Sequence, residues 1–300
     1  MYNFKMCKVC YKQESRLRYK LRNANVFVCP DCGLHYIDYL DNIEEIIPTT
    51  KNILTDEAIK YINNGLQYNQ DRFLNHIKII NQLFPSLRGL KILDIGCGGG
   101  LFINLMKKEG ADVTGIELSD VRVAYAKETY GIQVYSYPVE HEFWQSNYHE
   151  AFDAITLWDV IEHVNFPVET LRKAVALLKK GGMLFMDTPC RDGFYHKIGC
   201  FTYKVSMGKY PTFLNSMYSN HPFGHKQILT LDEMATIFKM ISLKTIILEK
   251  FHELSFPYRF YLEKFITSNL LNSILLPMVT MFFRLFRIKN KILAVGRKED

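Results

Sequence analysis

Short apolar runs, separated by turns and helical stretches, repeat along the middle of the chain. The apolar runs predict strands at 90–95, 112–117, 132–137, 152–157 and 182–187. Between them, helical spacing of apolar residues predicts helices at 101–108 and 167–179. Strands that alternate with helices form a parallel sheet with helices on both faces, and ligands bind at the carboxyl ends of its strands. We therefore predict a doubly wound α/β fold.

The regions on either side of this core also carry recognisable patterns. Apolar residues at helical spacing predict two helices, near 55–68 and 71–84, and a proline ends the second. The acidic stretch 41–51 predicts a linker in front of them. Near the C-terminus, 245–250 and 291–297 predict two antiparallel strands. These two strands complete a mostly parallel, seven-stranded sheet.

Composition and charge place the chain among ordinary globular proteins. Its 300 residues are 48% hydrophobic and 23% charged, which excludes a wholly disordered, collagen-like or disulfide-stapled chain. A net charge of +6 is too small to indicate nucleic-acid binding by itself. The first twenty residues lack the apolar segment of a secretory signal. We therefore expect a cytoplasmic protein whose cysteines stay reduced or bind metal.

Four of the seven cysteines form two Cys-x-x-Cys pairs, Cys7 with Cys10 and Cys29 with Cys32, separated by eighteen residues. Two pairs at this separation place four thiolates around one Zn²⁺. The hairpin between the pairs is too short to fold without the metal. Because cysteines supply all four ligands, the site is closed. We therefore predict a structural zinc ribbon in residues 1–40.

A glycine-rich turn joins the first predicted strand to its helix at residues 94–100, with the sequence Asp-Ile-Gly-Cys-Gly-Gly-Gly. Glycines here let the backbone approach a nucleoside and its amino-acid tail, because no Cβ stands in the way. Glu117 ends the next strand, nineteen residues after Gly98, where a carboxylate can accept hydrogen bonds from both ribose hydroxyls. The Asp-x-Gly-x-Gly order differs from the Gly-x-Gly-x-x-Gly of dinucleotide dehydrogenases.

The glycine turn and the segments 152–163 and 178–186 resemble class I S-adenosylmethionine (SAM)-dependent methyltransferases, over about residues 70–250 plus the final strand. Within that class the chain resembles ubiquinone-biosynthesis O-methyltransferases and enzymes of surface-glycan pathways. The shared features are the Gly-Cys-Gly-Gly-Gly turn and a cluster of Asp159, Glu162 and His163. The N-terminal zinc knuckle is not part of the quinone enzymes' usual pattern.

This resemblance implies a Rossmann-like methyltransferase fold, SAM as cofactor, and a set of cofactor contacts. Matched by position, these contacts are Asp94, Gly96, Cys97, Gly98, Glu117, Leu118, Val139, Trp158 and Arg72. Glu117 would hold the ribose, while Leu118 and Val139 would flank the adenine. Trp158 would line the sulfonium side, and Arg72 would pair with the methionine carboxylate. The first acid of the motif would orient the glycine loop.

The quinone enzymes associate a Glu-x-x-Glu-His cluster with a divalent cation. Here the first acid is Asp159, one methylene shorter, so whether Asp159, Glu162 and His163 bind a cation stays open.

The segment 190–228, after the fifth strand, is long and rich in aromatic residues. A long insertion at the strand ends is where such enzymes build a lid over the acceptor. His225 stands near its end, and an imidazole of near-neutral pKa can take the proton of a hydroxyl that attacks a methyl group. We predict His225 as the catalytic base, with His163 and His221 as alternatives. A purely structural hydrogen bond is the other interpretation of His225.

Residues 265–283 carry no charge, and four basic residues follow, from Arg284 to Lys291. The stretch is nearly long enough for a membrane span, but the strands that flank it must pair in one sheet. It therefore has to return to the side on which it began. We predict a hydrophobic helical insertion over 254–288 that lies on a membrane surface, with its basic residues at anionic headgroups. Packing on the sheet edge or a dimer contact is the alternative.

The chain is therefore expected to comprise a zinc ribbon (1–40), a helical linker (41–88), a methyltransferase domain (89–253 and 289–300) and the insertion (254–288). We expect methyl transfer from SAM to a hydroxyl of an apolar or lipid-linked, quinone-like or glycan-pathway acceptor, at the inner face of the membrane. One alternative is an RNA methyltransferase whose ribbon binds nucleic acid, although the Asn/Asp-Pro-Pro-Tyr loop of base-amino methylases is absent. The other is a cofactor-binding regulator without turnover. The sequence leaves the acceptor and homo-oligomerisation open.

Overall fold

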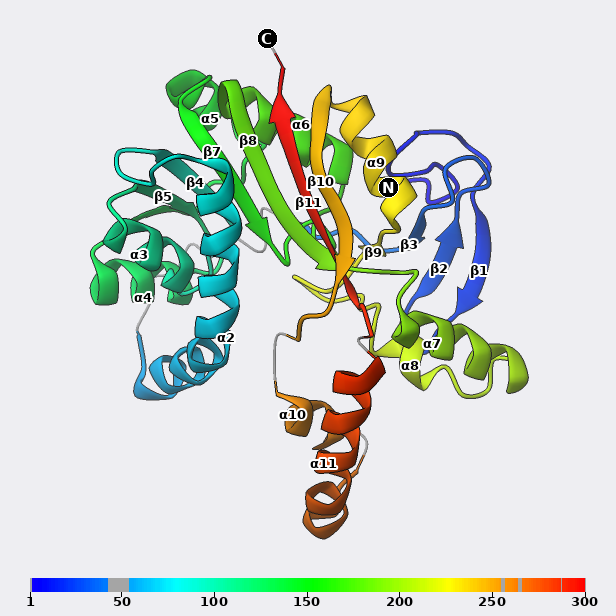
Figure 1. The fold of residues 1–300 in the computed structure, drawn as a ribbon. Coiled ribbons are helices and arrows are strands. Elements are labelled where there is room, and N and C mark those ends of the chain that lie inside the picture. The colour runs from blue at the N-terminus through cyan, green and yellow to red at the C-terminus, as the bar shows by residue number, and fades with distance from the viewer. Residues whose placement is uncertain (1, 43–53, 255–256, 264–265, 287, 300) are drawn as a thin grey trace.

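The computed structural model describes residues 2–42, 54–254, 257–263, 266–286 and 288–299 (Figure 1). The predicted linker at 41–51 lies almost wholly outside these ranges. The main sheet has seven strands in the order β10-β11-β8-β7-β4-β5-β6. Their bounds are β4 Lys91–Ile95, β5 Asp112–Ile116, β6 Gln133–Tyr135, β7 Phe152–Trp158, β8 Leu178–Pro189, β10 Leu243–Phe251 and β11 Lys291–Lys298. Only β11 runs antiparallel to its neighbours, β8 and β10. The predicted fold class is confirmed.

Helices cover both faces of this sheet. They are α2 Asp56–Leu83, α3 Leu101–Lys108, α4 Asp120–Tyr130, α5 Glu142–Tyr148, α6 Pro167–Leu177 and α9 Leu231–Met240. Successive strand residues enter opposite cores, as the two-residue period of a strand requires. Ile92 and Phe185 pack with α2, α3 and α4, while Leu93 and Leu184 pack with α5, α6 and α9. Both faces of the central strands are therefore buried.

The region predicted as two helices, near 55–68 and 71–84, forms the single helix α2, so that prediction is wrong. Thr55 caps its start by accepting a hydrogen bond from the Ala58 amide, and the helix ends just before Pro85. The polar residues between the two apolar patterns interrupt the periodicity. They include no proline or glycine that would break the helix, and Asn69 donates to the carbonyl of Gly65 within it.

A second, antiparallel sheet contains the N-terminal cysteine segment, with the order β1-β2-β3-β9. Its strands are β1 Arg16–Lys20, β2 Asn25–Val28, β3 His35–Ile37 and β9 Gln227–Ile228. The fourth strand thus comes from a distant part of the chain, at the end of the predicted lid. That lid contains α7 Phe194–Val205 and α8 Thr212–Asn215, which lie below the second sheet in Figure 1.

The hydrophobic insertion between β10 and β11 forms α10 Tyr258–Glu263 and α11 Asn269–Phe286, which project away from the sheets (Figure 1). Because β10 and β11 pair along their length, the insertion leaves and rejoins the sheet at one place, as predicted. Aromatic contacts join α11 to α7, with ring centroids 6.4 Å apart for Phe194 and Phe282. In the part of the chain that the structure describes, no helix has the length and apolar character needed to cross a membrane.

Candidate active site

The glycine loop between β4 and α3 is bent into backbone conformations that favour glycine. Gly96 has φ +75°, and a Cβ added there would lie 2.6 Å from the side chain of Val160. Gly98 also has a positive φ, of +55°, but a Cβ there would meet no atom within 4 Å. The loop is therefore tightly packed behind Gly96 and open in front of Gly98, which leaves space where a ligand could approach the backbone.

Glu117 is buried, and its carboxylate is held against this loop. One oxygen accepts a hydrogen bond from the amide of Gly98 and the other from the amide of Ser119, both at 2.8 Å. These two bonds fix the carboxylate at the carboxyl end of β5, beside the open part of the loop. The acid and the glycine loop are therefore in direct contact, and the ribose-binding role of Glu117 stays a prediction.

The other predicted cofactor residues surround the same strand ends. Asp94 is fully buried and accepts a hydrogen bond from the Thr156 hydroxyl at 2.6 Å, and burial raises its pKa to about 7. The Cys97 side chain lies in the core, so a cofactor could contact only its backbone. Leu118 is half-buried beside Glu117, whereas Val139 is fully buried.

Trp158, at the end of β7, is buried and stacks on His76 of α2, with ring centroids 3.9 Å apart. Its indole N–H has no hydrogen-bond partner among the described residues. An unpaired buried donor at this point indicates a polar ligand or water.

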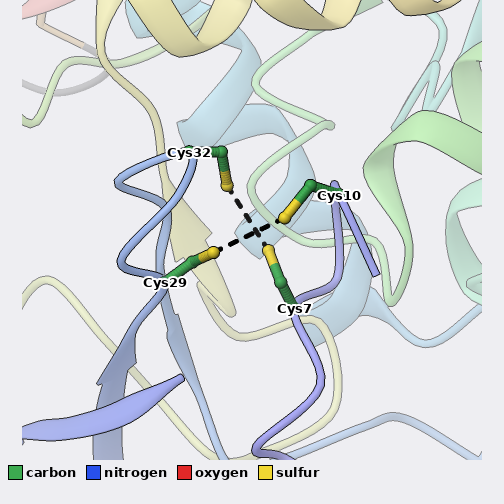
Figure 2. Close-up of side chains that lie close together, drawn as sticks. All are labelled: Cys7, Cys10, Cys29 and Cys32. Atoms are coloured by element: carbon green, nitrogen blue, oxygen red, sulfur yellow. Dashed lines mark hydrogen bonds between the residues drawn. The ribbon is translucent and has the colours of Figure 1, made fainter. Parts of the chain in front are cut away.

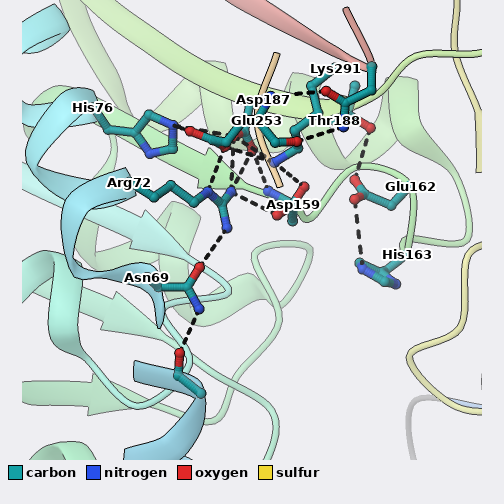
Figure 3. A network of polar contacts seen from close by, with 12 residues as sticks. Asn69, Arg72, His76, Asp159, Glu162, His163, Asp187, Thr188, Glu253 and Lys291 are labelled. Atoms are coloured by element: carbon teal, nitrogen blue, oxygen red, sulfur yellow. Dashed lines mark hydrogen bonds and ion pairs between the residues drawn. The ribbon is translucent and has the colours of Figure 1, made fainter. Parts of the chain in front are cut away.

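Arg72 lies in a buried cluster of charges that the sequence did not predict (Figure 3). Its guanidinium is within 2.9 Å of a carboxylate oxygen of each of three acids, and Lys291 contacts the same three within 3.2 Å. The acids are Asp159, Asp187 and Glu253. His76 Nε2 lies 3.3 Å from Asp187 and from Glu253. The cluster ties α2 to the ends of β7 and β8 and to both ends of the insertion.

The charges in this cluster stabilise one another. Burial opposes the ionised form of Asp187, but Lys291 and Arg72 hold its pKa well below the usual range. Burial likewise opposes the charge on Lys291, yet the three carboxylates raise its pKa. Arg72 and Lys291 thus face three carboxylates, and hydrogen bonding to Asp187 and Glu253 raises the pKa of His76 despite its burial, which favours its protonated form. Removal of any one would leave a buried charge uncompensated.

A cavity of about 260 Å³ opens beside this cluster. It is lined by Asp159, Glu162, His163, Pro189, His225, Glu253, Tyr261, Asn290 and Lys291. The structure thus brings two of the predicted catalytic histidines, His163 and His225, into one cavity with their rings 4.7 Å apart. The third, His221, is exposed and is not part of this lining. Glu253, Tyr261 and Asn290 also line the cavity, and no sequence pattern had indicated their contribution.

His225 is oriented by its own lid segment. Its Nδ1 lies 3.1 Å from the carbonyl of Met217, which can only accept, so Nδ1 carries the proton and Nε2 keeps its lone pair. Burial lowers the pKa of His225, and the nearby Glu162 opposes that shift. The imidazole is therefore neutral at pH 7 and has the protonation state of a base.

Glu162 is fully buried next to this histidine. The Thr188 hydroxyl donates to one of its oxygens at 2.9 Å, and the other has no hydrogen-bond partner among the described residues. Burial and the charge of Asp159 raise the pKa of Glu162 to about 7. Ligand atoms of Glu162, His163 and His225 lie within 4.8 Å of one another, whereas Asp159 is engaged by Arg72 and Lys291. The residues that could bind a cation are therefore Glu162, His163 and His225. The sequence had suggested Asp159 in place of His225.

The four predicted zinc ligands converge in the N-terminal ribbon (Figure 2). The Sγ atoms of Cys7 and Cys32 are 3.5 Å apart, as are those of Cys10 and Cys29. Four thiolates around one Zn²⁺ at 2.3 Å would have sulfur–sulfur separations of about 3.8 Å. The donor set and its spacing therefore fit a closed zinc site.

The strand order, the glycine loop and the acid at the end of the next strand define a Rossmann-like α/β protein of the methyltransferase class. Residues 68–246 match the family described as "Methyltransferase domain", and the chain belongs to this family. The match covers nearly the same residues as the resemblance found in the sequence, which is thereby confirmed.

Curated relatives and solved structures agree with this assignment. A ubiquinone biosynthesis O-methyltransferase of Histophilus somni is 38% identical over 119 residues, which are 37% of this chain and 50% of that protein. One from Actinobacillus pleuropneumoniae is 38% identical over 125 residues, 38% of this chain and 53% of that protein. The chain thus spans about half the length of these relatives. A SAM-dependent methyltransferase structure from Archaeoglobus fulgidus has a TM-score of 0.50 at 16% identity, covering 79% of this chain and 99% of that one, which shows a shared fold.

Proposed function

We propose that this protein transfers a methyl group from SAM to a hydroxyl group of an apolar acceptor. The observation that carries the proposal is the cavity beside the strand ends, where a neutral His225 lies next to the buried Glu162. The cavity borders β7, which pairs with the glycine-loop strand β4, so acceptor and cofactor would meet at adjacent strand ends. The relatives that methylate oxygen in ubiquinone biosynthesis favour a hydroxyl as the acceptor group.

Bound SAM would supply a methyl group already activated on a sulfonium. Glu117 and the glycine loop would hold the ribose and the amino-acid tail, Leu118 and Val139 would flank the adenine, and Trp158 would line the sulfonium side. Arg72 lies at the same end of the sheet, where it already contacts three carboxylates. In the predicted contact, the methionine carboxylate of SAM would be the fourth.

The residues of the cavity would then align the acceptor and remove its proton. Much of the rate would come from holding the hydroxyl oxygen in line with the bond to be broken. His225 Nε2 would take the hydroxyl proton as the new oxygen–carbon bond forms and the sulfur–carbon bond breaks. The carboxylate form of Glu162 would stabilise the imidazolium that results.

A transfer assay tests this proposal. The protein is incubated with SAM carrying a tritiated methyl group and, separately, with an alkylated catechol, a mixture of ribosomal RNA, or buffer. We expect label to enter the organic phase with the catechol, because its hydroxyl can reach His225. Label found in the RNA would instead support the RNA methyltransferase. Tight SAM binding without transfer to either acceptor would support the regulator.

We also propose that the ribbon binds one Zn²⁺ through Cys7, Cys10, Cys29 and Cys32, since these thiols converge and supply a complete ligand set. The division into a ribbon (1–40), a helical linker (41–88), a methyltransferase domain (89–253 and 289–300) and an insertion (254–288) remains part of the same proposal.

The insertion supports a further proposal, that the protein contacts the anionic inner face of a membrane from the cytoplasm. The outward side of α11 presents apolar side chains that are each more than half exposed, namely Leu270, Ile274, Met278, Met281 and Leu285. On α7, Phe201 and Val205 are exposed in the same way. Neither the segment 193–231 nor the segment 264–298 contains an acidic residue, while both contain lysines. Apolar surface on segments whose own charges are all positive suits anionic lipid.

Flotation with phosphatidylcholine–phosphatidylglycerol vesicles tests this contact. Substitution of Ile274→Asp, Met278→Asp and Met281→Asp should lower vesicle binding at least about 10-fold, because three apolar side chains leave the bilayer. The matched control carries Asn269→Asp, Ser273→Asp and Thr280→Asp, which add the same charge to the polar side of the same helix. Equal flotation of the two triple variants would contradict the proposal.

A further inference from the structure

The two-residue strand β9 connects the cysteine ribbon with the candidate active site. It begins two residues after His225 and pairs with β3, which places Gln227 opposite Tyr36 and Ile228 opposite His35. The Ile37 amide also donates to the Lys226 carbonyl at 2.9 Å. The segment that carries His225 is therefore hydrogen-bonded into the ribbon sheet.

The same segment also holds the loop that carries Glu162 and His163. The Gln227 side-chain amide donates to the carbonyls of Ile161 and Val164, at 2.7 and 2.8 Å. The Lys226 backbone amide donates to the Glu162 carbonyl at 2.8 Å, and its ammonium donates to the His163 carbonyl at 2.7 Å. Both Lys226 and Gln227 are fully buried. Buried hydrogen bonds of this kind fix a loop because no water replaces them when they break.

The fold of the ribbon itself depends on its two Cys-x-x-Cys turns, or knuckles, at residues 7–10 and 29–32. β3 begins two residues after Gly33, whose amide donates to the Cys29 carbonyl within the second knuckle. Arg191, at the start of the lid, donates to the Gly33 carbonyl at 3.0 Å and also contacts the Ile228 carbonyl and Glu233. A ribbon this small has little core of its own, so its strands should lose their order when the metal leaves.

We infer that Lys226 and Gln227 are positioning residues, through which the metal-loaded ribbon sets the placement of His225 relative to Glu162 and His163. The ribbon would thus act on the acceptor side of the site instead of binding nucleic acid. This loop touches the cofactor side where Val160 packs on Gly96, but the predicted ribose acid takes its support elsewhere, from the bonds of Glu117 to the Gly98 and Ser119 amides. Loss of metal should therefore disturb the acceptor side and spare SAM binding. The inference rests on the proposed zinc site and, for its catalytic consequence, on the proposed function.

Hydrogen exchange and calorimetry on the full chain test it without any acceptor. The Gln227→Ala variant leaves the ribbon ligands intact but leaves the Ile161 and Val164 carbonyls unpaired. We expect amide exchange in residues 159–164 to become at least about 10-fold faster, while affinity for S-adenosylhomocysteine changes less than about twofold. The matched control is Gln145→Ala, which removes a side-chain bond to the Lys173 carbonyl on α6, away from the cavity.

A second experiment tests the role of the metal. Elemental analysis of the wild type should first give about one zinc per chain. The double variant Cys29→Ser, Cys32→Ser then lacks two of the four ligands. Faster exchange in both 159–164 and 219–229, with S-adenosylhomocysteine affinity retained, is the expected result. Unchanged exchange in the folded cysteine variant, or a wild type without metal, would overturn the role of the metal. If that variant does not fold, the Gln227→Ala arm decides whether β9 positions the loop, and unchanged exchange there overturns the inference. Failure of the transfer assay alone would overturn only the proposed function.

Discussion

Replacing Glu117 with alanine should weaken SAM binding about 100-fold or more. A carboxylate that accepts both ribose hydroxyls makes two charge-assisted hydrogen bonds, each contributing roughly 1.5–3 kcal/mol. The substitution also removes the partners of the Gly98 and Ser119 amides, so the glycine loop loses the support that holds it open for the ligand. Since about 1.4 kcal/mol corresponds to a tenfold change, the loss of even two weak bonds of this kind accounts for the expected effect.

Titration calorimetry with S-adenosylhomocysteine measures this change. Glu128→Ala is the control, because Glu128 is an exposed acid on the following helix and its removal changes the net charge equally. Its affinity should stay within about twofold of the wild type. A Glu117→Ala protein that melts like the wild type and binds S-adenosylhomocysteine equally well would remove the ribose assignment.

Most of the main sheet was predictable because its signal is local. The buried parts of β4, β7 and β8 are apolar runs, and the glycine turn after β4 lies in the expected place, whereas Gly181 and Gly182 lie inside β8, which begins earlier than predicted. The family resemblance depends on the same segments. The cysteine ribbon was equally clear, because two Cys-x-x-Cys pairs at this spacing have few structural uses in a reduced protein.

The buried charge cluster was not predictable in the same way. Its members come from α2, from the ends of β7 and β8, and from both ends of the insertion, so no window of sequence contains them. One signal was present, since Asp187 ends an apolar strand and Lys291 begins another. A charge at the end of a buried strand requires a partner, but the pattern does not say which one. Likewise, the register that brings Gln227 onto the loop of Glu162 depends on the pairing of β9 with β3.

The His225→Gln variant should lower kcat for methyl transfer by about 10²–10⁴, the usual contribution of a general base, while SAM affinity stays within about twofold. Glutamine preserves much of the volume but cannot take up the proton. The control is His221→Gln in the same lid segment, where the histidine is exposed and outside the cavity lining, and its kcat should stay near the wild-type value. If His221→Gln instead causes the loss and His225→Gln does not, the roles of the two histidines are reversed.

The pH dependence of kcat/KM distinguishes a base from a merely structural histidine. The active form of His225 is the neutral one, and burial lowers its pKa below the ordinary value. Activity should therefore persist as pH falls through about 6.5, the value of a free histidine, and decline only at lower pH, when Nε2 becomes protonated. Glu162, with a pKa of about 7, still carries part of its negative charge where the decline begins, and this charge favours the imidazolium and shifts the decline to higher pH. In Glu162→Gln the acid limb should move to still lower pH, because His225 loses the nearby negative charge. In His225→Gln the limb should disappear, whereas a limb that survives in that variant would show that another group removes the proton.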